Sequence, residues 1–362
     1  MEIPVTKPFF PNRMDLEEYL EGIWKREWLT NNGPLLNEYE LELKRVLQVP
    51  HLLVVTNGTL ALQLAFKALG ISGKILTTPF SYVATTSSLV WEGCTPVFVD
   101  IDPHTFNIDP TKIESAIDEN TQAIVATHCF GNACDIAAID KIAKRHDLKV
   151  IYDASHCFGS SYKGKSLLNF GDFSTLSLHA TKLIHCTEGG ALVSQDPELI
   201  KRITYMRNLG HDGPGQFNGV GINGKCSELH AAMGLSVLKH HKEILQDRKK
   251  KYRRYLDGLS GESVSFQRLN PDAESNYSYF PILLESENIL LEVMAQLEGH
   301  RIGTRRYFYP GLNELEYVRK QQMSVCDSIA QRILCLPLYF DLSEEEQLLI
   351  IRIVKRVLRY LK

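Results

Sequence analysis

The stretch Ser177-Leu178-His179-Ala180-Thr181-Lys182, closed by Glu188-Gly189-Gly190, decides the fold and the chemistry that we expect for this chain. It lies between two runs of strand-forming residues, so Lys182 falls in a tight connection between strands and not on a solvated helix face. Partial burial or neighbouring positive charge lowers the pKa of such an amine and makes it a nucleophile toward carbonyl compounds. Most lysines are simply solvated, so Lys182 needs support from residues elsewhere in the chain.

The region on both sides of this stretch alternates between short β-rich runs and helical patterns, which is typical of a mostly parallel sheet covered by helices. We therefore predict an α/β fold with a large seven-stranded sheet, preceded by two helices near residues 16–28 and 35–47. The strands are expected at residues 52–55, 75–78, 96–99, 123–127, 150–152, 173–178 and 191–194, with helices at 59–69, 83–91, 109–117 and 135–145. In such sheets ligands bind at the carboxyl ends of the strands.

The last third of the chain has a different pattern, which predicts a smaller α+β domain. We expect one long helix over residues 226–259, in which the basic run 247–254 forms a solvated face. Strands at 277–284 and 332–336 and a helix at 287–298 follow. The final helix opens with a Ser343–Glu346 capping box and carries an apolar stripe that ends at Leu361. The expected domains are residues 1–240, which bind the cofactor, and residues 241–362.

Composition argues against several classes of function. The 40 basic and 43 acidic residues give a net charge of −3, so nothing attracts nucleic acid or a membrane surface. Residues 1–11 lack a signal-peptide core, and no run approaches the roughly 20 apolar residues of a membrane span, so we expect a cytoplasmic protein. The eight cysteines should then be reduced. Three cysteines follow a histidine directly, in His128-Cys129, His156-Cys157 and His185-Cys186. Because these pairs lack the spacing of metal ligands, we expect no metal site.

Three strand ends carry residues that fit a ligand. Asn57-Gly58-Thr59 opens a helix whose N-terminus offers free N–H groups to a phosphate, although Asn-Gly also marks ordinary turns. Tyr82, after the second strand, offers a ring for stacking, although a lone tyrosine is more often core or rim. Asp153 stands at the end of the fifth strand, where a buried carboxylate is costly unless it is paired. The structural alternative is that Asp153 caps the following helix.

Together these residues fit one cofactor, pyridoxal 5′-phosphate (PLP). The cofactor phosphate would bind at the helix N-terminus, with Ser177 as a further contact. The ring would lie against Tyr82 or His156, Asp153 would keep the pyridine nitrogen protonated, and Lys182 would form the Schiff base.

At these residues the sequence resembles the DegT-type sugar-nucleotide aminotransferases, which have the aspartate-aminotransferase-like fold of PLP enzymes (fold-type I). The resemblance runs nearly end to end. It rests most on Asn57-Gly58-Thr59, Asp153-Ala154-Ser155-His156, Ser177-Leu178-His179-Ala180-Thr181-Lys182 and Gly221-Ile222-Asn223-Gly224-Lys225.

The resemblance implies a role for each matching position. Gly58, Thr59 and Ser177 match phosphate-binding positions, next to Asn57, and Tyr82 matches the ring-stacking position. Asp153 matches the partner of the pyridine nitrogen, His156 lies near the ring, and Lys182 matches the Schiff-base lysine. Asn223 matches an asparagine that reaches the cofactor phosphate of the neighbouring subunit, which implies a homodimer with shared active sites.

The resemblance also implies a substrate. Relatives that replace the lysine with histidine dehydrate sugars, so Lys182 indicates transamination. The Ser-x-His-x-x-Lys form followed by Glu-Gly-Gly is similar to the branch that aminates C4, and most of all to enzymes that make dTDP-4-amino-4,6-dideoxy-D-glucose with L-glutamate as amino donor. The product would serve deoxysugar or surface-glycan biosynthesis, such as lipopolysaccharide O-antigen.

The sequence departs from the family pattern at two places, and two alternative functions remain. Leu178 stands where many relatives have Phe, and Asn223-Gly224-Lys225 stands where Asn-Tyr-Arg is common. The alternatives are an aminotransferase acting on C3 or on a UDP-keto-sugar, and a non-catalytic PLP-binding regulatory protein. His185, Lys225, Arg305 and Tyr309 are either sugar-side or structural residues.

Overall fold

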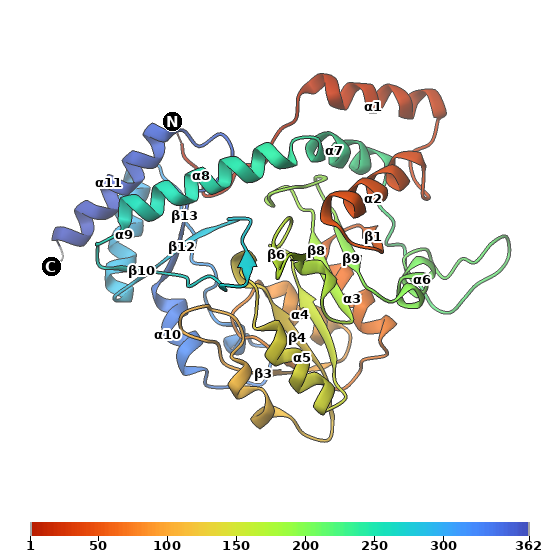
Figure 1. Cartoon of the computed structure of the whole chain (residues 1–362), viewed down its shortest axis with the longest axis horizontal. Helices are drawn as coiled ribbons and strands as arrows, with labels where there is room; N and C mark the ends of the chain where they lie inside the picture. The colour runs from red at the N-terminus through yellow and green to blue at the C-terminus, as the bar shows by residue number, and fades with distance from the viewer. Residues whose placement is uncertain (1, 361–362) are drawn as a thin grey trace.

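A seven-stranded sheet forms the centre of the computed structural model, which describes residues 2–360 (Figure 1). The strand order is β1-β9-β8-β5-β4-β2-β3. Neighbouring strands are parallel except for β9, which runs antiparallel to both β1 and β8. The prediction of seven mostly parallel strands is confirmed. Their bounds are β1 Leu52–Val55, β2 Lys74–Thr77, β3 Thr95–Phe98, β4 Thr121–Thr127, β5 Lys149–Asp153, β8 Phe173–Ser177 and β9 Gly190–Val193.

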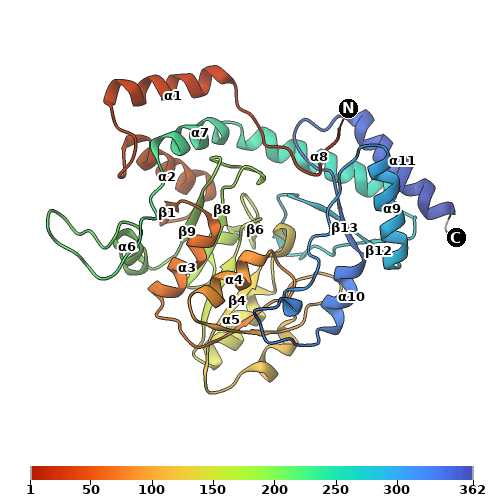
Figure 2. The ribbon, with the colours of Figure 1, turned by 180° about the vertical axis from the view of Figure 1, so that it is seen from behind.

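Helices cover both faces of this sheet because its strands bury side chains on both sides. Along β1, Leu52 and Val54 join one core and Leu53 and Val55 join the other. The first core includes side chains of α1 (Arg13–Arg26), α2 (Pro34–Leu47), α5 (Ile136–Arg145) and α7 (Glu228–Leu238). The second includes those of α3 (Gly58–Ala68), α4 (Val83–Trp91) and α6 (Pro197–Met206). Figure 2 shows α3 and α4 in front of the sheet.

The prediction of a helix over residues 109–117 was wrong. Two 3₁₀ turns, η1 (Pro110–Lys112) and η2 (Glu114–Ala116), occupy this segment. Ile117 donates to the carbonyl of Glu114 and then leaves the helical conformation at ψ 133°. Ile113 is fully buried but no residue of either turn is, so no continuous apolar stripe stabilises an α-helix here. Further 3₁₀ turns are η3 (Cys129–Gly131), η4 (Leu167–Asn169) and η5 (Leu312–Glu314).

The long helix expected over residues 226–259 is two helices, α7 and α8 (His241–Leu259). The N–H of His240 donates to Val237 at 3.0 Å, three residues back. The ring Nδ1 of His241 lies 2.7 Å from the carbonyl of Leu238, which a continuous helix would pair with residue 242. The side chain of His241 therefore ends α7, and α8 continues toward the C-terminal elements (Figure 1).

The C-terminal elements form a separate core around a three-stranded antiparallel sheet, β10 (Val264–Phe266), β12 (Phe280–Leu284) and β13 (Ile333–Leu336). The helices here are α9 (Glu287–Gly299), α10 (Ser324–Arg332) and α11 (Glu344–Tyr360). Ile3 packs into the same core. The Ser343–Glu346 capping box is confirmed, with bonds of 2.8 and 3.1 Å, while Leu361 lies outside the described residues. A small sheet combines β11 (Ala273–Glu274), β6 (Ser161–Tyr162) and β7 (Lys165–Ser166). The domain division at residue 240 stays a prediction.

The basic run 247–254 is not a uniformly solvated face. Arg248 and Lys251 are buried on α8. Arg248 donates to the carbonyl of Leu338, and Lys251 donates to the carbonyls of Tyr339 and Phe340. These two cations therefore fix the segment after β13 against α8. None of the helices formed by residues 2–360 is long and apolar enough to cross a bilayer.

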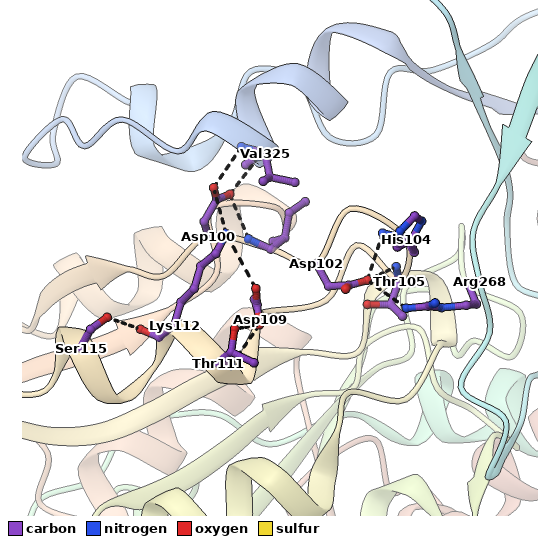
Figure 3. Close-up of polar contacts among 12 residues, drawn as sticks. Asp100, Asp102, His104, Thr105, Asp109, Thr111, Lys112, Ser115, Arg268 and Val325 are labelled. Carbon is purple, nitrogen blue, oxygen red and sulfur yellow. Dashed lines mark hydrogen bonds and ion pairs between the residues drawn. The ribbon is translucent and has the colours of Figure 1, made fainter.

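A carboxylate near the end of β3 connects the large sheet to the C-terminal region (Figure 3). Asp100 accepts hydrogen bonds from the backbone N–H groups of Val325, at 3.0 Å, and Cys326, at 2.9 Å, at the start of α10. Lys112 lies 3.6 Å from the same carboxylate. Asp100 thus acts as a helix cap from a distant part of the sequence, where it also meets the positive end of the helix dipole.

Replacing Asp100 with Ala should lower the free energy of unfolding by about 1–2 kcal/mol, because two N–H groups at the start of α10 lose their acceptor. Urea denaturation followed by circular dichroism measures this change. Asp140→Ala removes an exposed carboxylate that pairs only with Lys144, and it should leave the unfolding curve in place. Equal effects of the two substitutions would contradict the capping role.

Candidate active site

Backbone hydrogen bonds within residues 178–189 hold the connection that carries Lys182. Leu178 and Gly189 pair across its base at 2.8 Å, and Ala180 donates to Thr187 at 2.7 Å. The N–H of Lys182 donates to the carbonyl of His179 at 2.8 Å. Lys182 therefore lies in a closed turn between β8 and β9, as the sequence predicts.

A cavity of about 400 Å³ opens above the carboxyl ends of the strands, and Lys182 lines it. Eight of the nine residues singled out from the sequence line this cavity. They are Asn57, Gly58, Thr59, Tyr82, Asp153, His156, Ser177 and Lys182. They come from four separate parts of the chain, so it is the topology of the sheet that brings them together.

The surroundings of Lys182 favour the neutral form of its amine. Burial lowers the pKa of this lysine, while the nearby Asp153 carboxylate acts in the opposite direction. The amine donates to the hydroxyl of Tyr279 at 3.4 Å and lies 6.0 Å from the centre of that ring. A neutral amine is both a nucleophile and a base, so Lys182 is suited to both tasks.

Asp153 is the last residue of β5 and is only 4% exposed. One carboxylate oxygen accepts from the hydroxyl of Thr85 at 2.7 Å, and the other accepts from the N–H of Ser155 at 3.1 Å. Each carboxylate oxygen has a second lone pair, so the group retains acceptor capacity for a ligand in the cavity.

His156 presents a neutral ring to the cavity. Burial, and to a lesser extent the charge of Lys182, lowers the pKa of His156 well below its usual value. Its Nδ1 accepts from the N–H of Phe130 at 3.3 Å, which assigns the ring proton to Nε2. The ring packs against Tyr279, with centroids 4.7 Å apart.

The N-terminus of α3 points at the same cavity. Asn57 caps this helix by accepting from the N–H of Leu60 at 2.8 Å. The N–H groups of Gly58 and Thr59 stand in the first turn, where an α-helix supplies no acceptor. A Cβ at position 58 would lie 3.3 Å from the Cβ of Ser177, so glycine lets these two segments approach. This geometry suits an anion.

Comparison with known proteins identifies the family. The family model described as the DegT/DnrJ/EryC1/StrS aminotransferase family matches residues 12–355. This chain belongs to that family. It is therefore an aminotransferase, and its fold is that of the PLP-dependent sugar aminotransferases.

Relatives match along nearly the whole chain. It is 40% identical to the dTDP-4-amino-4,6-dideoxy-D-glucose transaminase of Escherichia coli, with 98% of each chain covered. It is 42% identical to the enzyme of the same name from Shigella dysenteriae, covering 95% of this chain and 96% of the other. Among solved structures, DesI in the presence of its TDP-sugar product superposes with a TM-score of 0.94 at 32% identity, covering 99% of this chain and 94% of that one.

Asn223 is the one singled-out residue of this aminotransferase that does not line the cavity of its own chain. It is exposed and accepts from the amine of Lys225 at 2.9 Å. The loop before it, residues 209–222, exposes large apolar side chains, including Phe217 at 65% and Val220 at 90%.

The structure distinguishes among the four residues that could have either a sugar-side or a structural role. His185 is buried and its Nε2 lies 2.8 Å from the carbonyl of Phe9, a structural contact. Lys225 bonds to Asn223, and the ring of Tyr309 stacks with Arg306 at 3.6 Å. Arg305 alone among the four lines the cavity.

Two groups of residues in and around the cavity were missed from the sequence. Tyr279, Tyr307 and Phe308 reach the cavity from the C-terminal region. No local pattern indicates this, because it depends on how the C-terminal elements pack against the large sheet. Ser81, Thr85 and Thr127 form a hydrogen-bonded line to Asp153. A signal for this line existed, since the run Thr85-Thr86-Ser87-Ser88 is unusually polar for a buried helix.

All eight cysteines are buried free thiols. Among residues 2–360, no group of three or more His, Cys, Asp or Glu side chains is arranged to hold a metal ion.

Lys182→Met should raise the free energy of unfolding of the cofactor-free protein at pH 7 by roughly 0.5–2 kcal/mol, because burial disfavours the charged amine. The folded-state pKa of Lys182 lies below its usual 10.5, so the unfolded chain binds this proton more tightly. Stability of the parent therefore rises with pH up to about 10.5, and the advantage of the variant shrinks over the same range. Urea denaturation at pH 7 and pH 9.5 measures both effects.

The matched control is Lys144→Met, at a lysine whose side chain is 75% exposed. It should give no gain in stability that depends on pH in this way. A Lys182 variant that is less stable than the parent at pH 7 would contradict the desolvation argument.

Proposed function

We propose that this protein is a PLP-dependent aminotransferase that aminates C4 of dTDP-4-keto-6-deoxy-D-glucose, with L-glutamate as amino donor. The observation that carries the proposal is the convergence of Lys182, Asp153 and the N-terminus of α3 on one cavity. Support for the sugar comes from the Escherichia coli and Shigella dysenteriae relatives, which are named for dTDP-4-amino-4,6-dideoxy-D-glucose. The product would enter deoxysugar or surface-glycan biosynthesis.

The residues of the cavity fit PLP. Gly58 and Thr59 offer backbone N–H groups, and Ser177 offers a hydroxyl, for a phosphate. Asp153 has unused acceptor capacity for a protonated ring nitrogen. Tyr82 and His156 offer rings, and Lys182 offers an amine whose pKa is lowered by burial. A buried carboxylate and a partly buried amine without an ion pair between them are costly, and a ligand that contacts both would explain why both are present.

The bound cofactor would supply an electron sink that makes the α-proton of the amino donor removable. Lys182 would move that proton, since its neutral amine accepts it from the α-carbon and the resulting ammonium gives it up again within the same half-reaction. With the keto-sugar, the same amine would run the proton transfer in reverse. Tyr279 would hold the amine in place through the 3.4 Å contact. Asp153 would keep its negative charge next to the ring nitrogen, held by Thr85 and Ser155.

Arg305 supports an anionic substrate. It is the one arginine among the described residues that line the cavity, and it is exposed near its opening beside Tyr307. Its guanidinium lies 5.9 Å from the ring of Tyr307, so its position is partly fixed. A guanidinium suits the carboxylate of L-glutamate or the pyrophosphate of a sugar nucleotide.

The active sites would be shared in a homodimer. The exposed apolar loop at residues 209–222 supports this, because such side chains normally become buried against a partner. Asn223 follows this loop, and we propose that it reaches the cofactor phosphate of the neighbouring subunit. Light scattering that finds only monomers at working concentration would contradict this part. We further propose that the protein acts in the cytoplasm, where its thiols stay reduced.

The purified protein with PLP should show the yellow absorbance of lysine-bound cofactor, and L-glutamate should bleach it while 2-oxoglutarate appears. Of separately supplied keto-sugars, dTDP-4-keto-6-deoxy-D-glucose should give the most amino-sugar product, ahead of UDP-linked and 3-keto sugars. Mass spectrometry of the products measures this. A preference for a 3-keto or UDP-linked sugar would contradict the substrate, and colour that is indifferent to every amino donor would favour a non-catalytic binder.

Lys182→Ala and Asp153→Ala should each lower turnover by about 10²–10⁴-fold, which is the range for loss of an acid–base or electrostatic group. Lys144→Ala, at an exposed lysine, should retain parent turnover.

A further inference from the structure

Three buried hydroxyl groups form a line that ends at Asp153. They are those of Thr127 at the end of β4, Ser81 after β2, and Thr85 in the first turn of α4, and each is at most 3% exposed. Thr127 lies 3.0 Å from Ser81, Ser81 lies 2.7 Å from Thr85, and Thr85 lies 2.7 Å from the Asp153 carboxylate. We call this line the hydroxyl relay.

The charge of Asp153 fixes the direction of every hydrogen in the relay. An ionised carboxylate can only accept, so Thr85 must donate to it. Thr85 has one hydroxyl hydrogen, so it must accept from Ser81, and Ser81 must in turn accept from Thr127. All three hydrogens therefore point toward Asp153, and consecutive hydrogen bonds of this kind strengthen one another.

The relay matters because Asp153 has few other sources of stabilisation. Among the described residues, the Asp153 carboxylate accepts one hydrogen bond from Thr85, at 2.7 Å, and one from the N–H of Ser155, at 3.1 Å, and neither donor is a cation. A nearly buried carboxylate without a contacting cation stays ionised only if donors replace the lost water. Thr85 supplies one of these two donors.

Thr85 also restricts where the carboxylate points. Its bond holds one oxygen of Asp153 and the Ser155 N–H holds the other, so rotation of the carboxylate would break both. The orientation is therefore set from α4 on one side and from the segment after β5 on the other. The remaining lone pairs are left for a group in the cavity.

We propose that Thr85 is a positioning residue for the transamination reaction, and that the hydroxyl relay holds Asp153 ionised and aimed at the ring nitrogen of the cofactor. This inference rests on the proposed function, since it assigns no role to Thr85 if the cavity does not bind PLP. Thr85 would affect the reaction through its hydrogen bond to Asp153, without touching the cofactor or the substrate.

The adjacent residue provides a matched control. Thr86 is also 0% exposed and also lies on α4, but its hydroxyl has no hydrogen-bond partner among residues 2–360. Thr85→Val and Thr86→Val each replace a hydroxyl with a methyl group of similar size in the same helix. They differ in whether the lost hydroxyl belongs to the relay.

The test measures the protonation of the ring nitrogen directly, with ¹⁵N-labelled PLP bound to the full-length protein and solid-state NMR. The parent and Thr86→Val should show the protonated-ring signal, and Thr85→Val should show a substantial neutral-ring signal. Turnover with L-glutamate should fall roughly 10- to 100-fold in Thr85→Val, as for loss of one hydrogen bond to a charged group, and stay within about twofold in Thr86→Val. Thr85→Ser, which keeps the hydroxyl, should restore both measurements.

Each remaining outcome contradicts either the hydroxyl relay alone or the proposed function on which it rests. A Thr85→Val protein with parent turnover and a protonated ring would overturn the relay alone, as would equal losses in Thr85→Val and Thr86→Val. If Thr85→Val fails to fold, Thr85→Ala removes the same hydroxyl and should give the same neutral-ring signal. A parent protein that binds no PLP would overturn the proposed function and the relay together.

Discussion

The carboxylate of Asp153 imposes the constraint around which the cavity is built. It ends β5, the middle strand of the seven in spatial order, and it is almost completely buried there. Such a group needs hydrogen-bond donors from its surroundings. The parallel strands on one side of β5 end at the same edge, and they bring Thr127 and the Ser81–Thr85 segment to it. On the other side, β8 leads to Ser177 and Lys182.

Burial acts on Asp153 and Lys182 in different ways. The carboxylate of Asp153 accepts hydrogen bonds from Thr85 and Ser155, which replace part of the lost water. Among the described residues, the hydrogen bond of the Lys182 amine is to the hydroxyl of Tyr279, and burial lowers the pKa of Lys182. The cavity therefore combines a hydrogen-bonded carboxylate with an amine whose neutral form is favoured. Transamination needs this division, since one group must hold charge and the other must move a proton.

The sequence was sufficient for the parts of the fold and the site that depend on local patterns. The seven strands, the turn at Lys182 and the helix that begins after Asn57 follow from alternation, capping and turn residues. The break at His241 and the 3₁₀ turns at residues 110–116 were missed, because each depends on a side-chain contact or on burial that no local pattern encodes. Tyr279 was predicted as part of a strand, and its role at Lys182 arises only when the C-terminal elements pack against the large sheet. The run of polar residues in this buried helix was a signal, but Thr85 was overlooked because its partner, Asp153, lies far away in the sequence.

The account depends most directly on the identity of the lysine that holds the cofactor. Treatment of the PLP-loaded protein with borohydride, followed by proteolysis and mass spectrometry, fixes the cofactor to its lysine and locates it. We predict a single phosphopyridoxyl group, on the peptide that contains Lys182. Labelling of another lysine, or of none, would contradict the central claim.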